Sequence, residues 1–321
     1  MGVFVFLPLV LPLTALPIAK LAAQHLHPRA TTRLLTLLSA VLGLCSTLCL
    51  ALLVVVGTAQ LPGNPLPDGW SDPEVRAAVP YAEIAGTAAI AALAAALAAG
   101  GTAVRRHGRV LARTHRALDG LPPGADPAVL PDDDPYAYAV PGTPGRPGKP
   151  ARPGRIAVSR GMLRSLDDAE RQALFAHERA HLNHRHHRYR LTVRLAGCVN
   201  PLLLPLRSAV AFSTERWADE EAAHVVGDRL LTARAVGKAA LITRSARLPE
   251  LAHFAAPEPG PVPRRVAALL APVPPARGWP PALTPVGLAA LIAAAGTAAS
   301  ALSSLNAAVA LFLVLKAATP L

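Results

Sequence analysis

The segment FAHERAHLNHRHHRYR, residues 175–190, holds five of the 11 histidines of the 321-residue chain. His177 and His181 lie four residues apart and frame Glu178 in the pattern His-Glu-x-x-His. On a helix this spacing places two imidazoles side by side on one face, where they can chelate one Zn²⁺. Glu178, rotated by about 100° around the helix, then faces a metal-bound water as a general base. The segment predicts a zinc-hydrolase site; the simpler alternative is a basic helix rich in histidine.

One continuous helix from about Leu166 to His187 is expected to carry this motif. Ser165 and Asp168 resemble a capping box at its start, and neither Gly nor Pro interrupts the residues that follow. The other histidines and arginines of the segment are then most simply the cationic last turn of the helix. Two short strands are expected before it, at 136–140 (YAYAV) and 155–159 (RIAVS).

A catalytic zinc ion needs a third protein ligand, and His187 is the first candidate. It stands six residues after His181. A histidine at that spacing reaches the metal only where a glycine turns the chain between them. Here His184 occupies the turning position, in a helix that we expect to be continuous. We therefore expect His187 to point elsewhere.

The second candidate is Glu215, in the segment STERWADEEAA (213–223). Glu215 and Asp219 are four residues apart, at the start of another expected helix. Two histidines and one glutamate form an established catalytic zinc set, and Asp219 is placed to hold the free N–H of a ligand histidine. The alternative is an acidic, solvated helix face. The His-Glu-x-x-His pattern upstream favours Glu215 as the third ligand.

Four uncharged, mostly apolar runs are candidates to cross the bilayer core as helices; they are Val3–Ala19, Leu34–Gly57, Ile84–Gly101 and Leu283–Leu315. A composition of 52% hydrophobic and 16% charged residues agrees with an integral membrane protein. The first run is expected to be a retained anchor, because no basic residue precedes it and Lys20 follows it. The third is the weakest, since alanine barely favours lipid over water, and the sequence leaves open whether it spans fully.

The charges between these runs alternate as the positive-inside rule describes. The loop after the first run is basic, and the loop after the second is mostly acidic. Five arginines follow the third run, between Arg105 and Arg116. The N-terminus is therefore expected outside, and the segment from Arg105 to about Pro281 in the cytoplasm. The net charge of +12 then indicates a lipid bilayer as partner and no nucleic acid, because only 4% of the chain is aromatic.

One further apolar stretch, LTVRLAGCVNPLLLPLRSAVAF (191–212), is expected not to cross the membrane. His181 and Glu215 must reach the same ion, so an even number of crossings separates them. Two crossings need about 40 residues, more than the interval provides. Arg194 and Arg207 disfavour the hydrocarbon core, and two prolines break a straight helix. We expect a bent apolar hairpin that packs on the zinc domain or dips into the inner leaflet.

Over about Pro135–Leu270 the chain resembles the membrane-integrated gluzincin peptidases. Five segments occur in the order seen in that group: AYAVPG, IAVSRGMLRSL, LFAHERAHLNHRHH, ERWADEEAA and PVPRRVAALL. The group includes the CAAX prenyl-protein endopeptidase, the HtpX heat-shock protease and the antirepressor-type β-lactam sensor peptidases. The chain ends at Leu321, soon after the last apolar run. We therefore expect no β-lactam-binding domain like that of the sensor peptidases.

The resemblance implies a complete zinc-peptidase site, with the strand RIAVS (155–159) lining the substrate cleft. The implied roles are zinc ligation by His177, His181 and Glu215, general base catalysis by Glu178, and support of a ligand by Asp219. Position alone suggests His224 and Arg265 as stabilisers of the oxyanion, and for each a structural role is the simpler one.

The expected fold is an α-helical membrane protein with an α+β, zincin-like metallopeptidase domain. Residues 1–104 are expected to form three transmembrane helices, 105–281 a cytoplasmic zinc metallopeptidase domain with a mobile Pro/Gly linker at 141–154, and 282–321 a C-terminal transmembrane helix. The expected function is that of a zinc-dependent, multi-pass cell-membrane endopeptidase acting on protein or peptide substrates at the inner face. The alternative is a membrane-bound signalling or scaffold protein that retains the peptidase fold.

Overall fold

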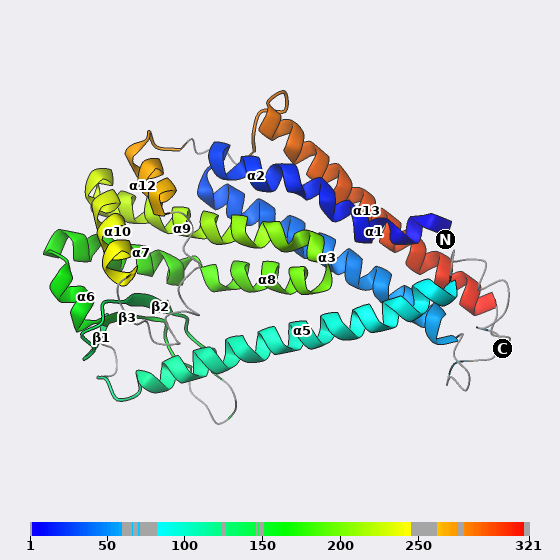
Figure 1. The fold of residues 1–321 in the computed structure, drawn as a ribbon, viewed down its shortest axis with the longest axis horizontal. Coiled ribbons are helices and arrows are strands. Elements are labelled where there is room, and N and C mark those ends of the chain that lie inside the picture. Colours follow the sequence, from blue (N-terminus) through cyan, green and yellow to red (C-terminus); the bar gives the residue numbers. More distant parts are fainter. Residues whose placement is uncertain are drawn as a thin grey trace.

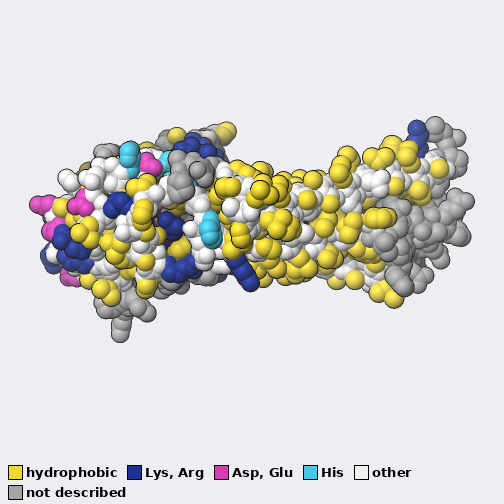
Figure 2. All heavy atoms as spheres, turned by 90° about the horizontal axis from the view of Figure 1, so that it is seen from above, with side chains coloured by type: hydrophobic (Ala, Val, Ile, Leu, Met, Phe, Trp, Pro, Cys, Tyr) yellow, Lys and Arg dark blue, Asp and Glu magenta, His cyan; other side chains and the backbone are white. Residues whose placement is uncertain are grey.

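The computed structural model describes residues 2–59, 66, 70, 82–122, 126–145, 147, 151–244, 262–274 and 279–317. These residues form an elongated molecule, with long helices bundled at one end and a small sheet with shorter helices at the other (Figure 1). In the space-filling view, hydrophobic side chains cover the bundle, and most of the charged side chains gather over the other end (Figure 2). This division is expected of a bundle in lipid joined to a domain in water.

Four segments are long and apolar enough to cross a membrane, as predicted: Phe4–His25, Pro28–Ala59, Ile84–Ala117 and Pro285–Ala317. The last three are the single helices α3 (Pro28–Ala59), α5 (Ala82–Ala117) and α13 (Pro285–Ala317). The first is a series of short pieces, η1 (Gly2–Phe6), α1 (Leu7–Val10), η2 (Leu11–Ala15) and α2 (Leu16–His25). A proline stands in the first turn of each of the last three pieces, where its missing N–H leaves no hydrogen bond unmade.

Helix α5 continues well past the apolar run that predicted it. Its 36 residues measure roughly 54 Å at 1.5 Å per residue, whereas the hydrocarbon core is about 30 Å thick. The expected boundary between residues 104 and 105 therefore lies inside one uninterrupted helix. The arginine-rich half of α5 lies beneath the sheet end of the molecule (Figure 1).

A three-stranded mixed sheet is the β part of the domain. Both predicted strands are present, as β2 (Ala137–Val140) and β3 (Arg155–Ser159), and they pair antiparallel. A third strand, β1 (Ala128–Leu130), pairs parallel with β3, so that the order is β1-β3-β2. The four residues Ile156–Ser159 of the central strand are all buried. The edge strand β2 buries alternate residues.

The two ends of the connector 141–154 pair with each other. Thr143 and Arg152 form an antiparallel bridge that extends the β2–β3 hairpin. Arg152 also makes an ion pair of 2.8 Å with Asp119, just after α5. The middle of the connector, at 146 and 148–150, lies outside the described residues.

The helix expected at Leu166–His187 begins later and ends earlier than predicted. Ser165 closes a short helix, α6 (Arg160–Ser165), and its hydroxyl donates to the Gly161 carbonyl. The histidine-bearing helix is α7 (Asp168–Asn183), capped by Asp167 in a capping box with Glu170. At its end Arg185 adopts a left-handed conformation with φ of 52°, and α8 (His186–Val199) starts in a new direction. No glycine marks this break, so the sequence pattern did not predict it.

The stretch 191–212 forms the expected hairpin, from α8, a 3₁₀ turn η4 (Pro201–Leu203) and α9 (Leu204–Val226). Both helices of the hairpin pack against α3. At its tip the Asn200 side-chain amide donates to the Leu9 carbonyl and to the Ser46 hydroxyl. Because Leu9 and Ser46 belong to the first two candidate spans, the hairpin packs against the spans as well as on the domain. Two further helices, α10 (Arg229–Arg244) and α12 (Val262–Leu270), cover α9 on the domain side.

Candidate metal centre

Three predicted ligand side chains meet between helices α7 and α9. The His177 and His181 Nε2 atoms are 3.1 Å apart. Glu215 Oε2 lies 3.6 Å from His177 Nε2, and Glu215 Oε1 lies 3.5 Å from His181 Nε2. One ligand atom from each residue lies within 4.8 Å of the others, so the three can hold a single metal ion. The spacing of four residues along α7 puts the histidines on one face, and packing of α9 against α7 supplies the glutamate.

Asp219, four residues after Glu215 on α9, stands behind one of these ligands. Its Oδ1 lies 3.0 Å from His177 Nδ1, the ring nitrogen that faces away from the cluster. A carboxylate in this position fixes the tautomer and the orientation of the imidazole.

His186 holds the other ligand histidine, a role that the sequence did not suggest. Its Nδ1 lies 2.8 Å from His181 Nδ1. The side chain is buried under Trp217 and Tyr189, and burial, together with the neighbouring His181, lowers the pKa of His186 to about 2. Burial likewise lowers the pKa of His187 to about 4. The expectation of a cationic last helical turn is therefore wrong for these two residues, which are neutral because the helix breaks before them and turns them inward.

Arg265, from helix α12, joins the two carboxylates of the site. Its guanidinium donates to both Asp219 oxygens, at 2.6 and 2.8 Å, and lies 3.2 Å from Glu215 Oε2. Burial alone would raise the pKa of Asp219, but the charge of Arg265 and its hydrogen bonds hold that pKa at about 2. Arg265 therefore keeps the carboxylates ionised in a buried setting. His224, the other residue suggested by position as a stabiliser of the oxyanion, is exposed.

Glu178 is buried beside the cluster and lines the same pocket as His177, His181 and Glu215. Burial raises the pKa of Glu178 to about 7, and the charge of Glu215 acts in the same direction. A carboxyl group with a pKa near neutrality can both accept and return a proton under physiological conditions. The geometry and the pKa of Glu178 therefore suit a general base.

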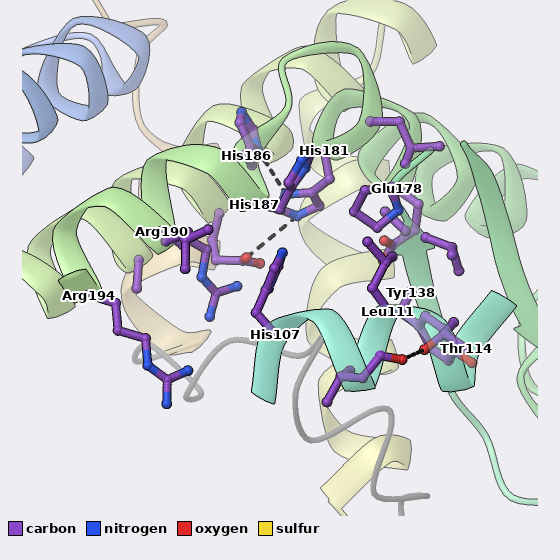
Figure 3. Close-up of a pocket in the computed structure, with 18 of the residues that line it drawn as sticks. His107, Leu111, Thr114, Tyr138, Glu178, His181, His186, His187, Arg190 and Arg194 are labelled. Carbon is purple, nitrogen blue, oxygen red and sulfur yellow. Dashed lines mark hydrogen bonds and ion pairs between the residues drawn. The ribbon is translucent and has the colours of Figure 1, made fainter. Parts of the chain in front are cut away.

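The pocket in front of the cluster has a volume of about 270 Å³ (Figure 3). One of its walls comes from the sheet and another from the long helix α5. Edge strand β2 lines it through residues 137–140, and the far half of α5 lines it through His107, Leu111 and Thr114. No residue of β3 is in the lining, so the expectation that RIAVS lines the cleft is wrong. The reason is the strand order, which places β3 in the centre of the sheet and β2 at the edge.

The wall from α5 was also missed by sequence reasoning. The expected boundary after residue 104 treated His107, Leu111 and Thr114 as the start of a separate domain. Their spacing of four and three residues gives them one helix face, which is the only signal in the sequence that they act together.

Residues 104–212 match the peptidase family M48. The matched range contains the His-Glu-x-x-His motif, the edge strand and the part of α5 that lines the pocket. The part of the chain that carries the metal-binding helix therefore belongs to the M48 family. Among curated proteins and solved structures, no match was found. The match of residues 104–212 to family M48 confirms the resemblance to the membrane-integrated gluzincin peptidases.

The match ends at residue 212, three residues before Glu215. In this M48 peptidase the third ligand position is therefore identified by the geometry of the cluster. The protein is a metallopeptidase with a His/His/Glu metal site and four candidate membrane spans.

Proposed function

We propose that this M48 peptidase is a zinc-dependent endopeptidase that hydrolyses protein substrates at the cytoplasmic face of the cell membrane. The observation that carries the proposal is the meeting of His177, His181 and Glu215 in one buried cluster with Glu178 beside it. Two imidazoles and one carboxylate are a donor set that zinc prefers at catalytic sites. Buried Glu215 Oε1, which has no hydrogen-bond partner among the described residues, fits this assignment.

Each residue of the site has one proposed task. Zinc bound by His177, His181 and Glu215 would lower the pKa of a water molecule towards 7 and polarise the scissile carbonyl. Glu178 takes the proton from the attacking water and passes it to the leaving amine. Asp219, ionised by Arg265, orients His177. Strand β2 is an edge strand that lines the pocket, so it is placed to pair with an extended substrate.

The charge pattern supports the placement of the domain in the cytoplasm. Residues 1–104 would supply three spans, 105–281 the cytoplasmic domain and 282–321 the last span, with α5 shared between the first two parts. The alternative, a scaffold that keeps the fold without hydrolysis, has no use for a buried base in the pocket. The intact Glu178 therefore favours an enzyme.

Metal content and hydrolysis separate these roles. The purified protein should hold about one zinc ion per chain by atomic emission, and His181→Ala and Glu215→Ala should lose it. Glu178→Gln should retain zinc but lose cleavage of a casein substrate by at least a hundredfold, because it removes a base and not a ligand. Glu221→Gln, on the same helix as Glu215, is the control and should keep both properties. Normal zinc binding by Glu215→Ala would contradict the ligand assignment, and full activity of Glu178→Gln would contradict the mechanism.

A further inference from the structure

The pocket has a second chemical feature at the end away from Glu178. Arg190 and Arg194 on α8 and Arg207 on α9 line this end, which we name the arginine end. In the close-up, Arg190 and Arg194 follow one another along α8, on the opposite side of the pocket from Glu178 (Figure 3). The arginine end lies towards the hairpin tip, and therefore towards the spans.

Helical spacing makes the arginine end continuous with the metal cluster. On α9, Arg207, Ala211 and Glu215 are successive residues four apart and all line the pocket. They occupy one face of the helix. The eight residues from Glu215 to Arg207 correspond to about 12 Å along the helix axis. An extended peptide covers this distance with about four residues.

In the part of the chain that the structure describes, no carboxylate lines the pocket beside Arg190 and Arg194. The acidic residues that line the pocket are Glu178 and Glu215, which belong to the metal site. Arg190 and Arg194 are half-buried, and neither makes an ion pair with a described carboxylate. Burial, followed by the charges of Arg207 and Arg106, lowers the pKa of Arg194. Arg190 and Arg194 therefore offer charged N–H donors that an anion in the pocket can bind.

We propose that the arginine end binds a carboxylate of the substrate peptide, either an acidic side chain or a free C-terminus, about four residues from the scissile bond. The proposal rests on the proposed function, because it places the substrate across the metal cluster. Guanidinium groups bind carboxylates through paired N–H donors, and such contacts are stronger in a half-buried pocket than in water. Val110, Leu111 and Leu191 also line the pocket, so apolar substrate residues are expected beside the charged one.

A peptide explains the arrangement better than a phospholipid headgroup does. Arg105 and Arg109 on α5 are exposed and do not line the pocket, so they are the cations that lipid phosphates can reach. Arg190 and Arg194 instead face the cavity that contains Glu178. An anion bound to them shares one enclosed space with the metal cluster, as a part of the substrate would.

Matched peptides test the proposal with the full-length, zinc-loaded protein in phosphatidylcholine nanodiscs. The site of cleavage in an apolar peptide is first mapped by mass spectrometry. Variants then carry Glu or Gln at the third to fifth residues from that bond, on either side. When the substitution lies on one particular side of the scissile bond, the wild type should cleave the Glu peptide with a kcat/KM about tenfold or more above that of the Gln peptide. In Arg190→Gln/Arg194→Gln this ratio should fall to about one. Arg188→Gln, an exposed residue of α8 outside the pocket, should keep the wild-type ratio.

Binding to the zinc-loaded Glu178→Gln protein separates this proposal from the proposed function. Fluorescence anisotropy should show the same Glu-over-Gln preference, and its loss when Arg190→Gln/Arg194→Gln is added, even if no peptide is hydrolysed by the wild type. Equal affinity for the Glu and Gln peptides would overturn the carboxylate site. Phosphatidylglycerol nanodiscs provide the lipid arm. If this lipid raised the melting temperature of the wild type but not of the double variant, while the peptides were bound equally, the arginine end would belong to a lipid phosphate and the proposal would be wrong.

Discussion

The two ligand histidines of the metal cluster are supported by different chemistry. Behind His177 stands the ionised carboxylate of Asp219, fixed by Arg265. Behind His181 stands the neutral imidazole of His186. With His181 Nε2 directed to the metal, its Nδ1–H donates to His186 Nδ1, and the proton of His186 sits on Nε2. That buried atom has no hydrogen-bond partner among the described residues. The contact between the two Nδ1 atoms places His186 to position His181.

We expect His186→Phe to weaken zinc binding by about ten- to a hundredfold, the usual effect of losing a hydrogen bond behind a ligand. The phenyl ring preserves the packing against Trp217 and Tyr189 but cannot accept the His181 proton. Competition with a chromogenic chelator measures the affinity. His184→Phe is the control, since His184 stacks on the same Trp217 without touching a ligand. Unchanged zinc affinity in His186→Phe, with normal thermal stability, would show that His186 only fills space.

The site was predictable from the sequence where ligands repeat at the helical interval. His177, His181, Glu215 and Asp219 follow this rule, because four residues advance a helix by about one turn. This rule does not identify His186 and Arg265, for two physical reasons. His186 is brought inward by a turn at Arg185, which is not a glycine. Arg265 lies on α12, 46 residues from Asp219 in sequence, and only tertiary packing brings it near.

At the scale of elements, the break after α7 and the hairpin that follows connect the metal cluster to the membrane. Strands β2 and β3 and the apolar spans were visible in the sequence as short β-rich segments and long uncharged runs. The break was not, because Arg185 enters the left-handed region without a glycine. Its consequence is large: α8 turns to lie along α3 and brings Arg190 and Arg194 into the pocket wall.

The contact between α3 and α8 depends on a glycine. A Cβ atom at Gly43 would stand 3.0 Å from the Cβ of Ala196. We expect Gly43→Leu to push α8 away and to destabilise the protein by about 1–3 kcal/mol, the usual range for overpacking. The melting temperature in detergent measures this effect. Leu44→Phe, at the adjacent exposed position, controls for added volume on the same helix. Equal melting temperatures for the wild type and Gly43→Leu would mean that α8 is not seated on α3 as described.

At the scale of the whole molecule, the arrangement of charges predicts its orientation. We expect reporter fusions at residues 70 and 150 to give opposite signals, with 70 outside and 150 in the cytoplasm, because the basic segments flank the inner side. Paired alkaline phosphatase and fluorescent-protein fusions provide the measurement. A fusion at residue 30 is the control and should report the cytoplasm. If 70 and 150 reported the same side, the alanine-rich segment of α5 would not cross, and the cytoplasmic placement would lose its basis.

Helix α5 also connects the bilayer mechanically to the pocket. It is a single continuous helix that runs from the bilayer to the pocket wall. Roughly 24 Å of its ~54 Å length extends beyond the hydrocarbon core. Long helices adapt to bilayers of different thickness by tilting, and a change of about 10° would move the end of α5 beside the sheet by about 4 Å. His107 and Leu111, which line the pocket, lie on that part of the helix. The lipid thickness should therefore set the width of the pocket, and cleavage rates should vary with acyl-chain length in vesicles. Thr102→Pro, which would introduce a kink in α5 between the bilayer and the pocket, should make the cleavage rate independent of acyl-chain length. If the wild-type rate were already independent of chain length, α5 would not transmit a change of tilt to the pocket.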